Sequence, residues 1–429
     1  RNGTCSYKTK IKMRVKLLLL VMIVNITVLA QRNMSFSERI RTVESVVNGD
    51  RQKPAVISLN GNDVVTVSFD DMTHDYVRYV YKLEHCDKEW NVSDGLFESD
   101  YMTGTNLDKP IEDYVQSMNT SNLYTHYKIN FPNQNVELLL SGNYKVSIYD
   151  EEDLDNPVAC ACFSVADKKI GIAATVSTNT DIDYNKAHQQ IELALNLNKV
   201  ELRDPAREVY VRILQNKRYD NAVSNPAPTF VSDREMKWQH CKELIFPAGN
   251  EFRKFEILDV HQPTLGVEKI RWFAPFYHAF LYPGKPFENY IYNKEVNGSY
   301  VIRNRNDVDC DTESEYVIVH FALEADKKNN NGEYYVCGQW NSYVFSPENK
   351  MKYDSQNGVY DASILLKQGY YNYSYLFVPK GEKKGLTSES EGDFFQTENE
   401  YTVYVYAHLQ GERYDRLLGY RDFRFVPNK

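Results

Sequence analysis

Nine histidines and seven cysteines are the side chains in this sequence best suited to metal binding or nucleophilic chemistry. No two histidines have the i, i+4 spacing with which one helix face binds zinc, and the sequence has no HExxH motif. His85–Cys86 and His240–Cys241 are neighbours on expected strands, so their side chains should point to opposite faces. His85, Cys86 and His126 could meet across a sheet, although structural roles are the stronger interpretation. The sequence therefore predicts no metal site and no cofactor.

Motifs for enzyme catalysis are missing as well. The sequence has no GxSxG elbow, no P-loop and no dinucleotide-binding fingerprint. Its acidic runs Asp70-Asp71 and Asp150–Asp155 fall at expected turns, where Asp side chains usually satisfy backbone groups. The second run has enough oxygens for calcium but lacks the glycine of an EF-hand turn. A glycosidase pair of carboxylates would leave no signature in the sequence. We predict no catalytic residues and a protein that is not an enzyme.

The composition favours β-structure. The 33 Tyr and 20 Phe residues, together with many Val and Ile, suit a pleated and half-buried surface. Residues alternate between apolar and polar in short runs that are separated by Gly, Asn, Asp or Pro, as in antiparallel strands. The clearest runs are 64–69, 76–83, 144–149, 209–214, 316–321 and 401–406. They predict an all-β fold of tandem antiparallel immunoglobulin-like or fibronectin-like β-sandwiches.

The length of the chain indicates three such sandwiches. Domains usually contain about 100–150 residues, and the polar segments Asp167–Lys169 and Asn304–Asp309 are suitable boundaries. We expect the first β-sandwich at residues 31–166, the second at 167–309 and the third, early-set immunoglobulin-like, at 310–429.

The first 30 residues have the pattern of a secretory signal peptide. Six basic residues and no acidic residue precede the apolar run 17–24, and small residues stand at positions −3 and −1 of a cut before Gln31. Met13 is the expected start, with residues 1–12 as extra upstream sequence. A membrane anchor is the alternative, but the run is shorter than the roughly 20 residues that a span requires. We expect cleavage and export of the mature chain.

Charge and cysteine content limit the possible partners. The whole chain carries a net charge of −9, and subtracting the six positive charges of the leader leaves −15 for residues 31–429. A surface this acidic disfavours nucleic acid and direct adhesion to anionic lipid. Disulfides are possible in an oxidising compartment, but a chain of this length can bury a core without them, and buried thiols are favoured for most cysteines. The six that follow the leader are Cys86, Cys160, Cys162, Cys241, Cys310 and Cys337.

Short aromatic and polar phrases follow one another in a characteristic order. They are Leu83–Trp90, Asn119–Tyr127, Phe131–Asn133, Ser141–Tyr144, Gln215–Arg218, Gly249–Arg253 and Leu366–Tyr371. Together they resemble the plug proteins of the type 9 secretion system of Bacteroidetes, and the resemblance extends from about Pro54 to Phe377. It implies a periplasmic protein that caps the outer-membrane translocon.

The third unit has a second resemblance. Tyr335–Tyr343, Gly358–Tyr360 and Leu366–Tyr373 resemble the early-set immunoglobulin-like modules of glycogen-binding domains. Those modules stack two tryptophans on sugar rings. Here Tyr343 stands at the first of these positions, and no tryptophan follows Trp340 to supply the second. The sequence thus indicates the fold of such modules without their sugar binding.

The plug resemblance implies a non-enzymatic protein that sterically seals the periplasmic end of the translocon barrel when no substrate is being exported. The implied partner is the outer-membrane translocon barrel protein with its complex, bound by one copy of this chain, without membrane insertion. A carbohydrate-binding accessory or scaffold protein of the Bacteroidetes envelope is the alternative, and an envelope enzyme with a sandwich accessory region is another. The residues of the protein interface remain unassigned at this level.

Overall fold

The computed structural model describes residues 32–305 and 309–427. These residues form many β-strands and a few single-turn helices, which confirms the all-β sandwich fold. The expected signal peptide, residues 1–30, lies outside the described residues. In the described ranges, no helix has both the length and the apolar character that a membrane span requires.

The first sandwich packs two sheets against each other. One sheet contains β1 (Met34–Ser35), β9 (Asp153–Ala166), β8 (Gly142–Asp150), β5 (Tyr79–Cys86) and β3 (Val56–Ser58). The other contains β2 (Ile40–Val47), β4 (Val65–Asp71), β7 (Thr125–Phe131) and β6 (Asp113–Gln116), and the short helix α2 (Glu98–Tyr101) lies between β5 and β6. Val65, Val67 and Phe69 alternate into the core, where the Phe69 ring stacks 5.1 Å from that of Tyr127. The period of two therefore buries one face of each strand.

The second sandwich combines strands from two distant parts of the chain. Its first sheet contains β10 (Gly171–Ser177), β11 (His188–Asn196), β15 (Glu235–Trp238), β14 (Phe230–Val231) and β16 (Ile245–Pro247). Its second sheet contains β13 (Arg218–Ser224), β12 (Val209–Gln215), β26 (Glu400–Ala407) and β27 (Arg416–Arg424). The single-turn helices α3 (Pro205–Glu208) and η1 (Lys242–Leu244) lie in its connections. The core is mainly aliphatic and includes Leu193, Val211 and Val405.

The third sandwich is formed by the residues between these two parts. One sheet contains β17 (Arg253–Ile257), β25 (Gly369–Pro379), β20 (Tyr300–Ile302) and β22 (Gly332–Cys337). The other contains β18 (Val267–Phe273), β19 (Phe276–Leu281), β21 (Tyr316–Glu324), β24 (Val359–Lys367) and β23 (Lys352–Asp354), and the 3-10 turn η2 (Gln339–Asn341) follows β22. Most strand pairs are antiparallel as expected, but β19 pairs with β21, and β3 with β9, in parallel.

The strand pairing corrects the expected boundaries of the second sandwich, 167–309, and of the third, 310–429. Strands β17 to β20 lie before residue 310 yet belong to the third sandwich, whereas β26 and β27 return to the second. Pairing of β12 with β26 runs without a break from Val209↔Ala407 to Gln215↔Tyr401. The third sandwich is therefore inserted into the second. Alternating polarity suits a near or a distant partner strand equally, so the sequence pattern could not reveal this insertion.

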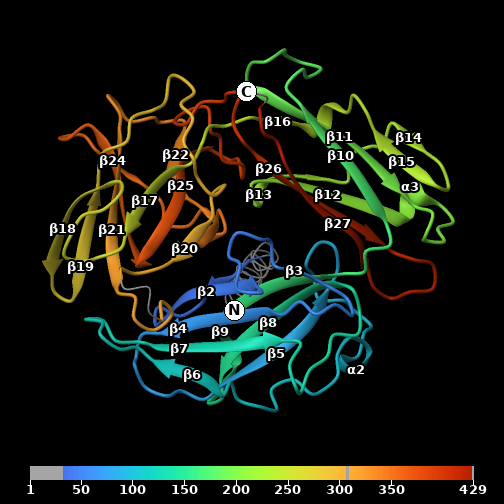
Figure 1. Cartoon of the computed structure of the whole chain (residues 1–429), viewed down its shortest axis with the longest axis horizontal. Helices are drawn as coiled ribbons and strands as arrows, with labels where there is room; N and C mark the ends of the chain where they lie inside the picture. Colours follow the sequence, from blue (N-terminus) through green and yellow to red (C-terminus); the bar gives the residue numbers. More distant parts are fainter. Residues whose placement is uncertain (1–31, 306–308, 428–429) are drawn as a thin grey trace, which may run out of the picture.

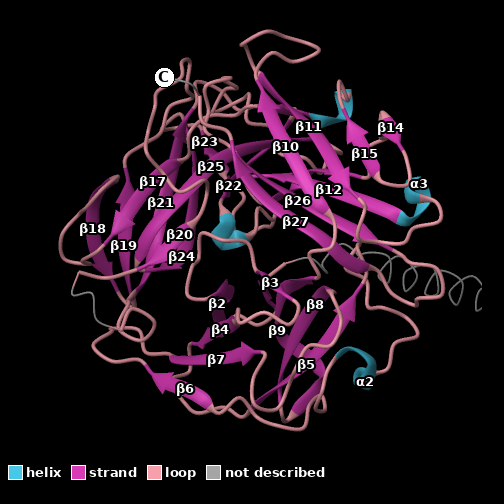
Figure 2. Cartoon of the chain, turned by 45° about the vertical axis from the view of Figure 1, so that its right-hand side comes forward, coloured by secondary structure: helices cyan, strands magenta, loops and turns pink. Residues whose placement is uncertain are grey.

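The three sandwiches surround a common centre. Figure 1 shows the first sandwich in blue and cyan at the bottom, the second at the upper right, completed by the red strands β26 and β27, and the third in yellow and orange at the left. Figure 2 shows the same arrangement from a second direction. The first sandwich hydrogen-bonds to the third through Lys367 and to the second through Arg212. The second and third sandwiches are joined by the two chain crossings. Each sandwich is thus connected to the other two.

Candidate functional site

Several buried polar groups with partners far away in the sequence lie where the sandwiches meet. At the contact between the first and third sandwiches, the Asp70 carboxylate at the end of β4 accepts hydrogen bonds from the Lys367 ammonium and the Tyr316 hydroxyl, both at 2.6 Å. His126 Nδ1 lies 2.7 Å from the same carboxylate. The Lys367 ammonium also lies 4.3 Å from the centre of the Tyr124 ring. Burial would raise the pKa of Asp70, but Lys367 and His126 outweigh it and lower that pKa. Asp70 is thus an ionised, hydrogen-bonded buried group.

A second group of contacts joins the same two sandwiches. Arg51 binds the Glu44 carboxylate with two nitrogens, at 3.0 and 2.9 Å, and reaches Asp311 of the third sandwich at 3.1 Å. The Glu315 carboxylate accepts the backbone N–H of Ser121 at 2.5 Å. Both contacts pair charged groups with hydrogen-bond donors, which is the geometry that makes buried charges tolerable.

The contact between the first and second sandwiches centres on Arg212 of β12. Its guanidinium lies 2.6 Å from Glu89 and donates to the backbone carbonyl of Lys88 at 2.9 Å, and its side chain is 5% exposed. Lys88 itself pairs with Asp415 of the second sandwich at 3.0 Å. The Tyr210 hydroxyl donates to Glu89 as well. These contacts fix the end of phrase Leu83–Trp90 against the second sandwich.

We expect the substitution Arg212→Met to lower the free energy of unfolding by about 2 kcal/mol, since it removes hydrogen bonds between a buried cation and two acceptors. Denaturant unfolding of the purified protein measures this change. Arg207→Met is the matched control, because the Arg207–Asp204 pair is 87% and 52% exposed. Its effect should stay within about 0.5 kcal/mol. Equal effects of the two substitutions would contradict a fastening role for Arg212.

Lys217 touches all three sandwiches. It stands in the two-residue turn between β12 and β13, where Asn216 and Lys217 both have positive φ, as a tight hairpin turn requires. Its ammonium donates to the backbone carbonyl of Gln52 in the first sandwich and, at 3.2 Å, to Ser299 Oγ in the third. Its side chain is only 9% exposed. Burial lowers the pKa of Lys217.

His85 and His126, which were considered as metal ligands from the sequence, make hydrogen bonds within the protein instead. His85 lies between Ser93 Oγ, at 2.8 Å, and the carbonyl of Ser141, and burial lowers its pKa to about 4. A Cβ at Gly142 would collide with its ring. His126 belongs to the opposite sheet, so the fold does not bring it to His85. In the described ranges, no group of three His, Cys, Asp or Glu residues is arranged to hold a metal ion.

The cysteines lie mostly in the interior. Cys86, Cys160, Cys241 and Cys337 are buried thiols. Burial raises the pKa of Cys86 to about 12 and that of Cys337 well above its usual value. Trp90 lies outside the main core of the first sandwich and packs on Cys160 and Cys162. The two thiols therefore lie on the same face of β9, the face turned away from the main core.

The residues that resemble a sugar-binding pattern are not available for stacking. Tyr343 is 1% exposed. The indole of Trp340 packs parallel to Phe321 and donates through Nε1 to the carbonyl of Asn372 at 3.2 Å. The Tyr343 ring is therefore buried, and Trp340 is held by its contacts inside the protein, which disfavours a surface sugar-binding pair of rings at this position.

Sequence reasoning missed Asp70, Lys367, Arg212 and Lys217 as site residues. Asp70 was expected at a turn, but it lies in β4 and is fully buried. The other three lie in or beside alternating strand runs, where a charged residue is ordinarily read as solvent-facing. For three of these residues the sequence does contain a feature that could have marked them as site residues. Arg212 interrupts the apolar end of its run, and Lys217 and Lys367 belong to phrases Gln215–Arg218 and Leu366–Tyr371.

The geometry defines a protein of three interlocked β-sandwiches whose polar phrases hold the junctions. Residues 40–167, the first sandwich, match the family described as type 9 secretion system plug protein, first domain. A crystal structure of a hypothetical protein from Parabacteroides merdae is similar over 92% of this chain and 100% of that chain, with 35% sequence identity and a TM-score of 0.89. No curated protein matches the sequence. The chain belongs to the family of type 9 secretion system plug proteins.

Proposed function

We propose that this protein is a non-enzymatic plug that sterically seals the periplasmic end of the type 9 secretion translocon barrel when no substrate is being exported. The match of residues 40–167 to the plug family carries this proposal. The implied partner is the outer-membrane translocon barrel protein and its complex. The implied location is the periplasm, on the periplasmic side of that complex, with one copy of this chain per translocon.

The junctions between the sandwiches support a steric mechanism. A plug must keep its shape while it covers an opening, and sandwiches joined by flexible linkers alone would not. Here the contact between the first and third sandwiches, which are not consecutive in the chain, is made by the buried cluster around Asp70. Release on arrival of cargo requires an interface with the translocon that is strong enough to seal but weak enough to dissociate. Such a moderate affinity is compatible with a broad interface, because buried area alone does not fix affinity.

The proposal predicts that a tagged copy of this protein, recovered from gently solubilised outer membranes, co-purifies with a very large barrel protein in a ratio near one to one. Saturating the channel with export substrate should reduce this recovery, because an occupied channel excludes the plug. Mass spectrometry of the eluate measures both outcomes. Recovery of the protein alone, or with components of polysaccharide uptake, would contradict the plug and favour the glycan-binding alternative.

A further inference from the structure

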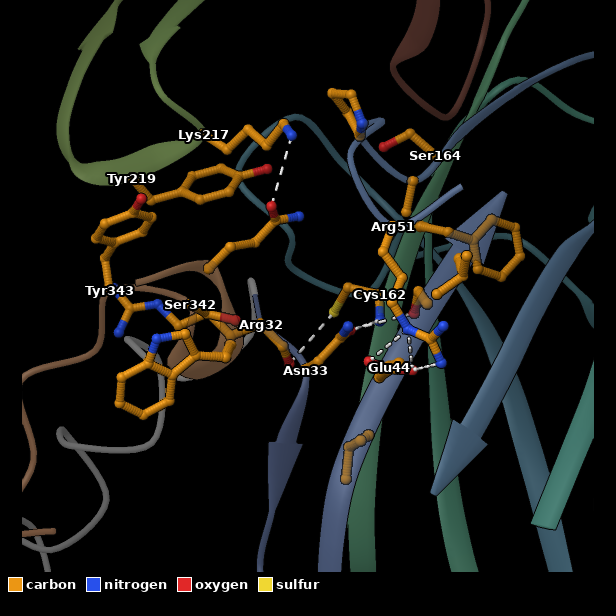
Figure 3. Close-up of a pocket in the computed structure, with 18 of the residues that line it drawn as sticks. Arg32, Asn33, Glu44, Arg51, Cys162, Ser164, Lys217, Tyr219, Ser342 and Tyr343 are labelled. Atoms are coloured by element: carbon orange, nitrogen blue, oxygen red, sulfur yellow. Dashed lines mark hydrogen bonds and ion pairs between the residues drawn. The ribbon is translucent and has the colours of Figure 1, made fainter. Parts of the chain in front are cut away.

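A small cavity lies at the point where the three sandwiches meet (Figure 3). Its volume is about 130 Å³. Arg32 and Arg51 reach it from the first sandwich, Lys217 from the second and Trp340 from the third. Figure 3 shows Lys217, Tyr219 and Tyr343 on one side of this space and Arg51 with Glu44 on the other. The cavity therefore exists only in the assembled arrangement of the three sandwiches.

The cavity is positively charged although the protein is acidic. Among the described residues that line it, four are charged, namely Arg32, Arg51, Lys217 and Glu44. Arg51 and Glu44 neutralise each other through their hydrogen-bonded pair at 3.0 Å. Lys217 donates to neutral oxygens, and its nearest carboxylate, Glu400, is 3.8 Å away. Glu400 balances Lys217, so Arg32 is the lining cation without an ion pair among the described residues, in a chain whose net charge is −9.

Among the residues that the structure describes, no carboxylate forms an ion pair with Arg32. Its Nε is buried and has no hydrogen-bond partner among the described residues. Asp220 is the carboxylate with the strongest effect on Arg32, but it is already held by Arg218 at 2.7 and 3.0 Å and by the N–H of Gly385 at 2.9 Å. Burial of a charged guanidinium without a paired anion costs free energy. Such a group is expected where a ligand supplies the missing charge.

We infer that this cavity binds a small organic anion, namely a carboxylate with a short apolar body. Arg32 offers the planar pair of donors that carboxylates favour. Trp90, Trp340 and Tyr300 supply apolar and aromatic walls. An engineered cavity of about 150 Å³ in another protein holds benzene, so a space of this size suits a ligand of roughly six to eight non-hydrogen atoms.

Binding at this place would act on the whole molecule. The anion would contact groups of the first, second and third sandwiches at once, and it would therefore stabilise their closed arrangement relative to any opened one. This inference does not depend on the proposed plug function. A ligand could regulate the shape of this protein whatever partner it binds.

The test uses the purified protein and 3-methylbutanoate as the probe, with 3-methylbutanamide as its uncharged analogue. At a concentration of about one hundred times its dissociation constant, the carboxylate should raise the melting temperature by about 2–5 °C. The amide should leave it unchanged, since it brings no negative charge. Inorganic phosphate is the third probe. Stabilisation by phosphate but not by the carboxylate would overturn the assignment of an organic carboxylate.

Variants separate binding from folding. Arg32→Met should melt at the same temperature as the unchanged protein or higher, because it removes an unpaired buried charge, yet it should weaken carboxylate binding at least tenfold in titration calorimetry. Arg271→Met, on the exposed part of β18, is the matched control and should bind normally. A carboxylate response that survives in Arg32→Met, or no response in the unchanged protein, would overturn the inference.

Discussion

Replacing Lys367 with methionine is expected to lower the free energy of unfolding by about 3–5 kcal/mol, the typical cost of leaving a buried charge without its partner. Lys367 and Asp70 are 2% and 1% exposed, and their charged atoms lie 2.6 Å apart. Of the partners that the structure describes, the substitution would leave the Asp70 carboxylate with His126 and Tyr316. Denaturant unfolding, followed by fluorescence, measures the change, and small-angle scattering should show a larger radius of gyration if the first and third sandwiches separate.

The control for this experiment is Lys350→Met. Lys350 pairs with Glu333 at 3.0 Å, but these side chains are 41% and 38% exposed, so the loss should remain below about 1 kcal/mol. The double substitution Asp70→Asn with Lys367→Met should cost less than the sum of the single ones, because it removes both charges. An effect of Lys367→Met as small as that of Lys350→Met would contradict a fastening role for the cluster. The test also bears on the plug, since an opened body should co-purify less well with the translocon.

Replacing Glu295 with glutamine is expected to stabilise the protein at alkaline pH. Glu295 is 8% exposed, and burial together with the neighbouring Glu251 raises its pKa to about 8. Its Oε2 has no hydrogen-bond partner among the described residues. Glu251 lies on the first crossing between the second and third sandwiches and accepts the N–H of Glu398, on the second crossing, at 3.2 Å. The acidic pair therefore lies at the junction between these two sandwiches.

The sign of the effect follows from proton binding. Between about pH 4.5 and pH 8 the folded protein retains a proton on Glu295 that the unfolded chain has lost, so stability contributed by this group falls as the pH rises through that range. At about 1.4 kcal/mol for each pKa unit, the loss between the unfolded pKa of 4.5 and the folded pKa of about 8 is on the order of 5 kcal/mol. Urea unfolding at pH 5, 7 and 9 should show this slope in the unchanged protein and a smaller slope in Glu295→Gln. Glu268→Gln, at an exposed position, should retain the original slope, and identical slopes in all three proteins would contradict the prediction.

The two substitutions probe opposite states of buried carboxyl groups. Asp70 is held ionised by a cation, so its contribution is present above its unfolded pKa and is lost as the pH falls toward its lowered folded value. Glu295 is held protonated by burial, so its contribution is lost as the pH rises. The junctions of this protein should consequently be most stable between the two limits.

Sequence reasoning succeeded where the chemistry is local. Alternation in runs such as 64–69 and 316–321 predicted strands that the structure contains, because a strand with one buried face needs a period of two. The family assignment drawn from the short aromatic and polar phrases is confirmed by the match of residues 40–167 to the plug family. Most of them lie at the junctions, where Lys88, Lys217 and Lys367 make contacts between sandwiches. Those contacts explain their polar character.

The amino-acid sequence by itself determined that this protein is all-β and belongs to the plug family, since side-chain periodicity and short phrases are read along the chain. Only the tertiary structure decided that β26 and β27 complete the second sandwich, and that Arg32, Lys217 and Trp340 line one cavity. The physical reason is that strand pairing and sandwich contacts join residues far apart in sequence. Many partners satisfy the same alternating pattern, and packing of the complete chain selects one of them.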